Sequence, residues 1–136
     1  MVAAPMLPSM TIVEAAGELR VIRSANVRDV VVTMLGATDG WTTGDNSFVL
    51  EFDSAPRKRL IDVDAPALTA MSPAASNGRS RASPRLERGD VPGRYLGRIT
   101  LQRSGEWNVT VAWGRAGSRE SATFPIPVQA ALKGAR

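Results

Sequence analysis

The chain has 136 residues, of which 43% are hydrophobic and 22% are charged, as in an ordinary single globular domain. It contains no cysteine and no histidine. These absences exclude disulfides, thiolate metal sites and every catalytic site that uses an imidazole base, such as a Ser-His-Asp triad. The formal net charge of +4 is evidence about solubility and non-specific binding rather than about a particular function. The composition therefore predicts a protein that is not an enzyme.

The ends of the chain differ from its middle in composition and hydrophobic pattern. Residues 1–16 contain two prolines and no hydrophobic period, which predicts a flexible N-terminal segment. The first ten residues lack a basic start and a long apolar stretch, so we expect no intact signal peptide. No run approaches the roughly 18 apolar residues of a transmembrane helix. We expect a β domain over 17–130 and a tail over 131–136.

Short apolar runs separated by turn residues follow from Gly17 onward, and period-two or β-branched patterns predict strands. The first half of the chain gives strands at 18–23, 29–35, 46–53 and 60–71. Phe48, Leu50 and Phe52 should share one face, whereas 37–46 is predicted to be a turn because of its Asp-Gly and Gly-Asp pairs. Pro66 should lie at a sheet edge or a bulge.

The second half contains a long polar segment and then the clearest alternation. A short strand is expected near 80–86, because structureless loops of this length are uncommon in compact domains. Three further strands, expected to be adjacent and antiparallel, are predicted at 93–103, 106–114 and 120–129. Seven or eight strands without a helical period predict an all-β fold, an immunoglobulin-like β-sandwich of antiparallel strands.

One candidate metal ligand stands out. Met71 precedes a Ser-Pro pair at the end of a predicted strand, and its thioether is a soft ligand suited to Cu(I). A methionine is more commonly a packing residue. A copper site would need further donors from Met34, from Met6 or Met10, or from another chain.

Two charged groups are also candidates. Asp62 and Asp64 lie two residues apart on a predicted strand, so they could hold a hard cation or form a solvated face. Five arginines are close enough in sequence to clamp phosphates: Arg79, Arg81, Arg85, Arg88 and Arg94. Glu87 and Asp90 interrupt them, and no aromatic residue accompanies them, which argues against a nucleic-acid partner.

The three tryptophans divide into two groups. Trp107 and Trp113 have even spacing on one predicted strand, which favours the core. Trp41 lies in the predicted turn and is expected to be exposed, where fold analogy alone suggests a surface for carbohydrate.

In the order of its predicted strands and the residues between them, the chain resembles the YtkA-like and FixH-like extracytoplasmic domains, which occur alone or appended to heavy-metal efflux adaptors. The resemblance rests on positions spread over residues 18–128: Trp41, Gly44, Asn46, Phe48, Met71, Pro73, Gly93, Tyr95, Gly105 and Trp107. It implies an immunoglobulin-like sandwich in the periplasm or outside the cytoplasm. It also implies a role in copper or heavy-metal handling, or in the assembly of a membrane complex.

This chain departs from the family in the segment 71–78, which reads MSPAASNG. Alanine, serine and asparagine replace the family's second methionine and its histidines, so Met71 is left as the metal ligand that the resemblance implies, with Cu(I) as the cofactor. The partner would be a membrane or periplasmic protein. The alternatives are a metal-free module that meets a protein through its edge strands or the 72–92 loop, and a basic nucleic-acid-binding domain.

Overall fold

The structure, a computed structural model, describes residues 19–38, 40–55, 59–72 and 81–131. Within these ranges the fold is all-β, and there is no helix, hence none long and apolar enough to cross a membrane. The predicted N-terminal segment 1–16 lies outside the described residues, as does the predicted tail 131–136 apart from its first residue.

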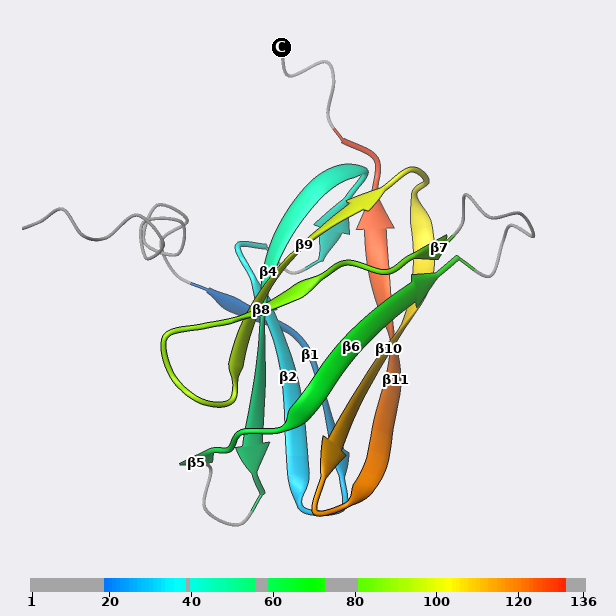
Figure 1. The fold of residues 1–136 in the computed structure, drawn as a ribbon. Coiled ribbons are helices and arrows are strands. Elements are labelled where there is room, and N and C mark those ends of the chain that lie inside the picture. The colour runs from blue at the N-terminus through cyan, green and yellow to red at the C-terminus, as the bar shows by residue number, and fades with distance from the viewer. Residues whose placement is uncertain (1–18, 39, 56–58, 73–80, 132–136) are drawn as a thin grey trace, which may run out of the picture.

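The strands form two sheets (Figure 1). Sheet A has the order β1 (Arg20–Val27), β2 (Val30–Gly36), β4 (Gly44–Ser54), β9 (Arg94–Leu101) and β8 (Leu86–Arg88), and β5 (Arg59–Leu60) pairs with one end of β4. Sheet B has the order β3 (Trp41–Thr42), β11 (Ser118–Gln129), β10 (Gly105–Arg115), β6 (Asp64–Met71) and β7 (Arg81–Ala82). All pairs are antiparallel except β3 with β11, which is parallel.

One hydrophobic core lies between the sheets in a sandwich-like arrangement. Strand β2 buries every second residue, and β11 does the same over its second half, so each strand gives one face to the core. Phe52 of sheet A packs edge-on against Trp113 of sheet B, with ring centroids 5.4 Å apart. Trp107 and Trp113 are both buried, as predicted. A fully buried side chain of this size contributes roughly 2–3 kcal/mol through the hydrophobic effect.

The prediction that β9, β10 and β11 are adjacent is wrong. Strands β10 and β11 form a hairpin, but β9 lies in sheet A between β4 and β8. The chain crosses from one sheet to the other after Leu101, and Gly105 makes the turn with a φ of 115°. The Trp107 indole donates to the Arg103 carbonyl across this connection at 3.0 Å.

Trp41 is not exposed, contrary to prediction: only 2% of its surface is accessible. The predicted turn contains the two-residue strand β3, which pairs with the end of β11 and places the Trp41 ring 5.6 Å from that of Phe48. Asn46 fixes the following turn by accepting from the Thr42 amide and donating to the Thr42 carbonyl, at 2.9 and 2.7 Å. A stacking surface for carbohydrate at Trp41 is therefore excluded.

Pro66 lies at a bulge, as predicted. The register of β6 against β10 pairs Ala67 with Ala112 but Asp64 with Gly114, so one extra residue is inserted on β6, and Ala65 there has a φ of 43°. The expected short strand near 80–86 is replaced by two shorter ones, β7 and β8, which belong to different sheets.

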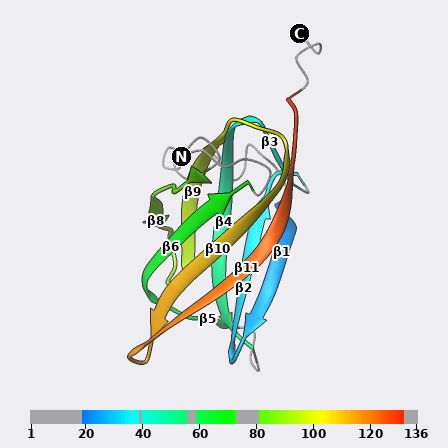
Figure 2. The ribbon, with the colours of Figure 1, turned by 90° about the vertical axis from the view of Figure 1, so that its right-hand side faces the viewer.

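Strands β1 and β11 run side by side along one margin of the two sheets (Figure 2). A bulge between Val21 and Arg23 turns Arg23 to this margin, where its Nε donates to the Pro125 carbonyl at 2.8 Å. Because the N and C=O of one strand residue point to the same side, the nitrogens of Pro125 and Pro127 also face this margin rather than β10.

Candidate functional site

An apolar row crosses the outer face of sheet A. The register places Val21 beside Leu35, Leu35 beside Val49, and Val49 beside Leu96, one residue from each of four neighbouring strands. We call these four residues the apolar row. Val21 is 59% exposed, whereas Val49 is only 4% exposed although it is not part of the core between the sheets. Val49 therefore faces away from the core and is nevertheless almost fully covered.

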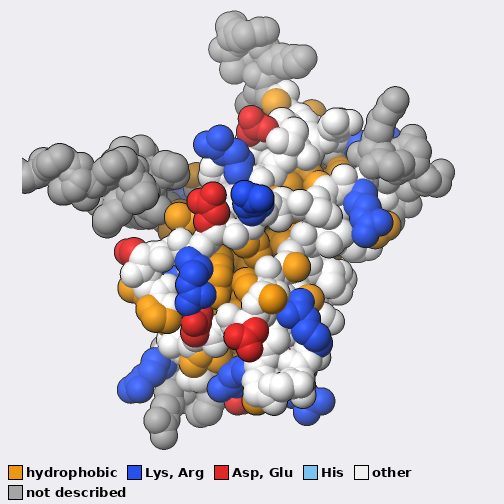
Figure 3. Space-filling view, viewed as in Figure 1, with side chains coloured by type: hydrophobic (Ala, Val, Ile, Leu, Met, Phe, Trp, Pro, Cys, Tyr) orange, Lys and Arg blue, Asp and Glu red, His pale blue; other side chains and the backbone are white. Residues whose placement is uncertain are grey.

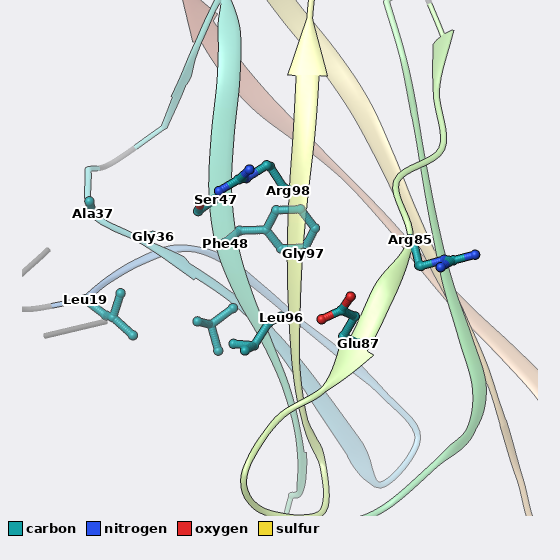
Figure 4. A pocket seen from close by; sticks show the side chains of 11 residues that line it. Leu19, Gly36, Ala37, Ser47, Phe48, Arg85, Glu87, Leu96, Gly97 and Arg98 are labelled. Atoms are coloured by element: carbon teal, nitrogen blue, oxygen red, sulfur yellow. The ribbon is translucent and has the colours of Figure 1, made fainter. Parts of the chain in front are cut away.

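A groove of about 410 Å³ lies over two members of this row, Val49 and Leu96, and Figure 4 shows the side chains that line it. Val21 and Leu35 are not among its lining residues. Its apolar floor includes Leu19, Val49 and Leu96, and it extends to Arg85 and Glu87 at the β8 border. Four strand spacings separate β1 from β8, which is roughly 19 Å, or the length of about six extended residues. The volume lies in the range of ligand-binding sites, which runs from about 300 to 1,000 Å³.

The floor of the groove depends on a glycine. Gly97 faces inward on β9, opposite Phe48 on β4, and a Cβ at Gly97 would come within 2.3 Å of the Phe48 ring. The ring therefore occupies the space that a side chain at position 97 would need. This arrangement lets both residues line the groove from below while Phe48 itself stays in the core.

Polar side chains border the groove on one side. Arg98 lies opposite Ser47 in the register and extends toward it on the outer face (Figure 4). Glu87 lies beside Leu96 in the register and points toward the groove, whereas Arg85 points away from it. Among the described residues, Arg98 has no acidic partner.

Strand β8, which borders the groove, is held by a polar latch of three residues: Asp62, Arg88 and Tyr95. The Arg88 guanidinium donates to Asp62 at 2.7 Å, and the Tyr95 hydroxyl lies 3.1 Å from the other Asp62 oxygen and 3.2 Å from the Val63 carbonyl. The hydrogen bond from Arg88 holds the pKa of the Asp62 carboxyl below its ordinary value. Burial, followed by the adjacent Asp62 carboxylate, raises the pKa of Tyr95.

Met71 lies on the outer face of sheet B and is 48% exposed. Its neighbours in the register are Asn108 on β10 and Arg81 on β7. Met34 is fully buried in the core and so cannot join Met71 on this outer face, and Met6 and Met10 lie outside the described residues. The structure thus brings no second described methionine to the predicted ligand.

The predicted carboxylate pair is divided between two roles. Asp62 belongs to the latch, whereas Asp64 begins β6 at the bulge and lies next to Gly114. No group of three or more His, Cys, Asp or Glu side chains among the described residues is placed to hold a metal ion.

The arginine cluster is also divided. Arg88 pairs with Asp62, and Arg94 pairs with Glu51 at 2.9 Å and with Asp90 at 3.3 Å. Basic and acidic side chains are interspersed on the face seen in Figure 3 rather than gathered by sign. Arg79 lies outside the described residues. A continuous basic track, which nucleic-acid backbones require, is not formed by these arginines.

The outer face of sheet B has a different composition. Its register aligns Thr69, Thr110 and Thr123 across three strands, and the Thr110 and Thr123 hydroxyls are 2.9 Å apart. The rows on either side are Ala67–Ala112–Ser121 and Met71–Asn108–Pro125. None of these nine residues is charged.

The apolar row was missed by sequence reasoning. Each member occupies an outward position on its own strand, where a single apolar residue is unremarkable. The signal was present only as isolated apolar residues between the core positions, such as Val49 between Phe48 and Leu50. Only the pairing of β1, β2, β4 and β9 brings them together.

Comparisons with known proteins bear on the fold. No protein-family model and no curated protein sequence matches the chain. A solved structure of a DUF4785 family protein from Legionella pneumophila subsp. pneumophila str. Philadelphia 1 is similar, with a TM-score of 0.54 at 12% identity. The similarity covers 76% of this chain but 30% of that one, so the chain spans less than a third of its length. Similarity at this identity extends to the β fold alone.

Proposed function

We propose that this protein is a non-catalytic, immunoglobulin-like module that binds an extended segment of a partner protein in the groove of sheet A. The observation that carries the proposal is the apolar row, because contiguous apolar surface on the outside of a sheet marks interaction sites. The groove is lined by residues from Leu19, next to β1, to Glu87 on β8, a span of about six extended residues, which suits a peptide segment.

The strand edges support this choice of a face over an edge. The outer edge of β11 carries two proline nitrogens and is covered by β1, and β8 has only three residues. Both features disfavour the addition of a partner strand. Compared with these two edges, the face of sheet A is the better candidate surface for a protein partner.

The resemblance to the YtkA-like and FixH-like domains supports an extracytoplasmic location and a partner in a membrane or periplasmic complex. A copper-handling role would rest on Met71, and no second described thioether lies beside it. We therefore favour the metal-free interaction role that the sequence left as an alternative.

The proposal is tested by NMR titration of the isotope-labelled protein with the hexapeptide acetyl-Asn-Val-Leu-Ser-Val-Leu-amide. We expect amide shifts to concentrate at the apolar row. Leu96→Asp and Val21→Asp should remove them, because each places a charge on the apolar floor or its continuation. Thr123→Asp, on the opposite outer face, is the matched control and should retain them. Shifts that are absent, or that concentrate on sheet B, would overturn the proposal.

A further inference from the structure

Two arginines on β9 occupy equivalent positions on either side of Leu96, and of the two Arg98 lines the groove. Arg94 and Arg98 both point outward, two residues before and after Leu96. Arg94 lies opposite Glu51 on β4, and the two form an ion pair at 2.9 Å. Arg98 lies opposite Ser47, so the position that supplies a carboxylate in one row supplies a hydroxyl in the other.

Arg94 and Arg98 therefore differ in their acidic partners. Asp90 adds a second carboxylate to Arg94 at 3.3 Å, whereas Arg98 has no acidic partner among the described residues. Glu87 belongs to the row of Val49 and Leu96 and lies across β9 on β8, and Arg85 points away from the groove. A ligand in the groove would thus meet an unpaired guanidinium at Arg98, on the Ser47 side, and the Glu87 carboxylate across β9. The neutralised Arg94 lies outside the groove lining.

Resting on the proposed function, we infer that the partner segment carries an Asp or Glu side chain that pairs with Arg98. A guanidinium offers two parallel donors to a carboxylate, and the Ser47 hydroxyl is a further donor on the same row. Rows two residues apart on a strand are separated by roughly 7 Å. The acidic residue therefore lies one or two positions from the apolar side chains that contact Val49 and Leu96.

The experiment compares three hexapeptides that differ only in their first residue, which is Asp, Asn or Lys, in front of the same Val-Leu-Ser-Val-Leu-amide. Dissociation constants are measured by NMR titration at low salt and again at about 0.5 M NaCl, where the Debye length is only a few ångströms and charge interactions are largely screened. We expect the Asp peptide to bind about two- to fivefold more tightly than the Asn peptide at low salt, and the Lys peptide to bind most weakly. The difference should vanish at high salt.

Two variants locate the source of this preference. Arg98→Gln should give the Asp and Asn peptides equal affinities. Ser47→Glu should do the same by giving Arg98 an internal partner, as Glu51 gives Arg94. Arg103→Gln is the matched control, since Arg103 is exposed and outside the groove lining, and it should keep the preference.

The outcomes separate the two proposals. Equal affinities for the Asp and Asn peptides in the wild type would overturn the inference and leave the proposed function intact. A preference for Asp that persists in Arg98→Gln would also overturn it, because the carboxylate would then be recognised elsewhere. If none of the three peptides shifts the apolar row, the proposed function itself fails and the inference fails with it.

Discussion

The outer faces of the two sheets differ in the burial of their side chains as well as in residue type. On sheet A, Val49 is nearly inaccessible although it faces away from the core, and Leu35 and Leu96 flank it on the neighbouring strands. On sheet B, the three central rows contain mainly threonine, alanine and serine, and these side chains add little thickness. Binding of a partner is stabilised more when it covers an apolar face of large side chains than when it covers a neutral face of small ones. This comparison is the reason for proposing sheet A rather than sheet B as the binding side.

The largest expected effect comes from filling the space under the groove. Gly97→Ala places a Cβ in the Phe48 ring and should lower the free energy of unfolding by about 1–3 kcal/mol, more than the gain from a stiffer unfolded chain. Ala112→Thr adds two heavy atoms to the outer face of sheet B and should change stability by about 0.5 kcal/mol or less. Urea denaturation measures both. Equal effects would show that the two faces tolerate bulk alike.

A smaller effect is expected from opening the latch that holds β8 at the groove border. Tyr95→Phe removes the hydroxyl bonded to Asp62 and Val63 and should cost about 1 kcal/mol, or a few degrees in Tm. Hydrogen exchange should quicken in β8 and β9 but not in β10 or β11. Uniform quickening in both sheets would show that the latch acts on the whole molecule.

The same latch predicts a pH dependence of stability. The folded pKa of Asp62 is lowered, so its contribution to stability is present above the unfolded value of about 3.9 and is lost as pH falls through the folded pKa. The Tm difference between wild type and Asp62→Asn should therefore shrink below about pH 4. The pKa of Tyr95 is raised, so its contribution should be lost above about pH 10. A Tm difference that stays constant from pH 3 to 7 would contradict this account of Asp62.

The smallest effect is expected at Met71, on the sheet B side of the comparison. Met71→Ala should change stability by about 0.5 kcal/mol or less, because the side chain is half exposed. We expect Cu(I) titration under reducing conditions to give the same affinity for this variant as for the wild type, since a lone thioether is a weak ligand. Tighter binding by the wild type would support the copper role implied by the family resemblance and weigh against a metal-free one.

Local patterns in the sequence were sufficient to identify strands and their faces. The alternation of Phe48, Leu50 and Phe52 placed these side chains correctly, because the period of two is a property of a single strand. Gly105 was also informative, since its positive φ marks a turn that other residues rarely adopt. Residues of this kind can be placed without knowing which distant residues they contact.

What could not be predicted depends on pairing between distant segments. Tyr95 contacts Asp62 across 33 positions, and the local sequence around either residue does not indicate this contact. The same holds for Ser47 and Arg98, which only the β4–β9 register brings together. Trp41 was misplaced for a related reason: the turn residues around it gave no sign of the two-residue strand β3, which pairs with the end of β11 and buries the side chain. The groove is likewise a product of strand order.

The margin between β1 and β11 has a consequence for molecules that open partially. If β1 detached from the Pro125 carbonyl, the edge of β11 would face solvent, as in many proteins that form fibrils through exposed strands. Pro125 and Pro127 would then present two nitrogens without hydrogens, spaced along that edge. A second chain pairing there would lose both backbone hydrogen bonds, so the opened molecule remains a poor template for strand-by-strand aggregation.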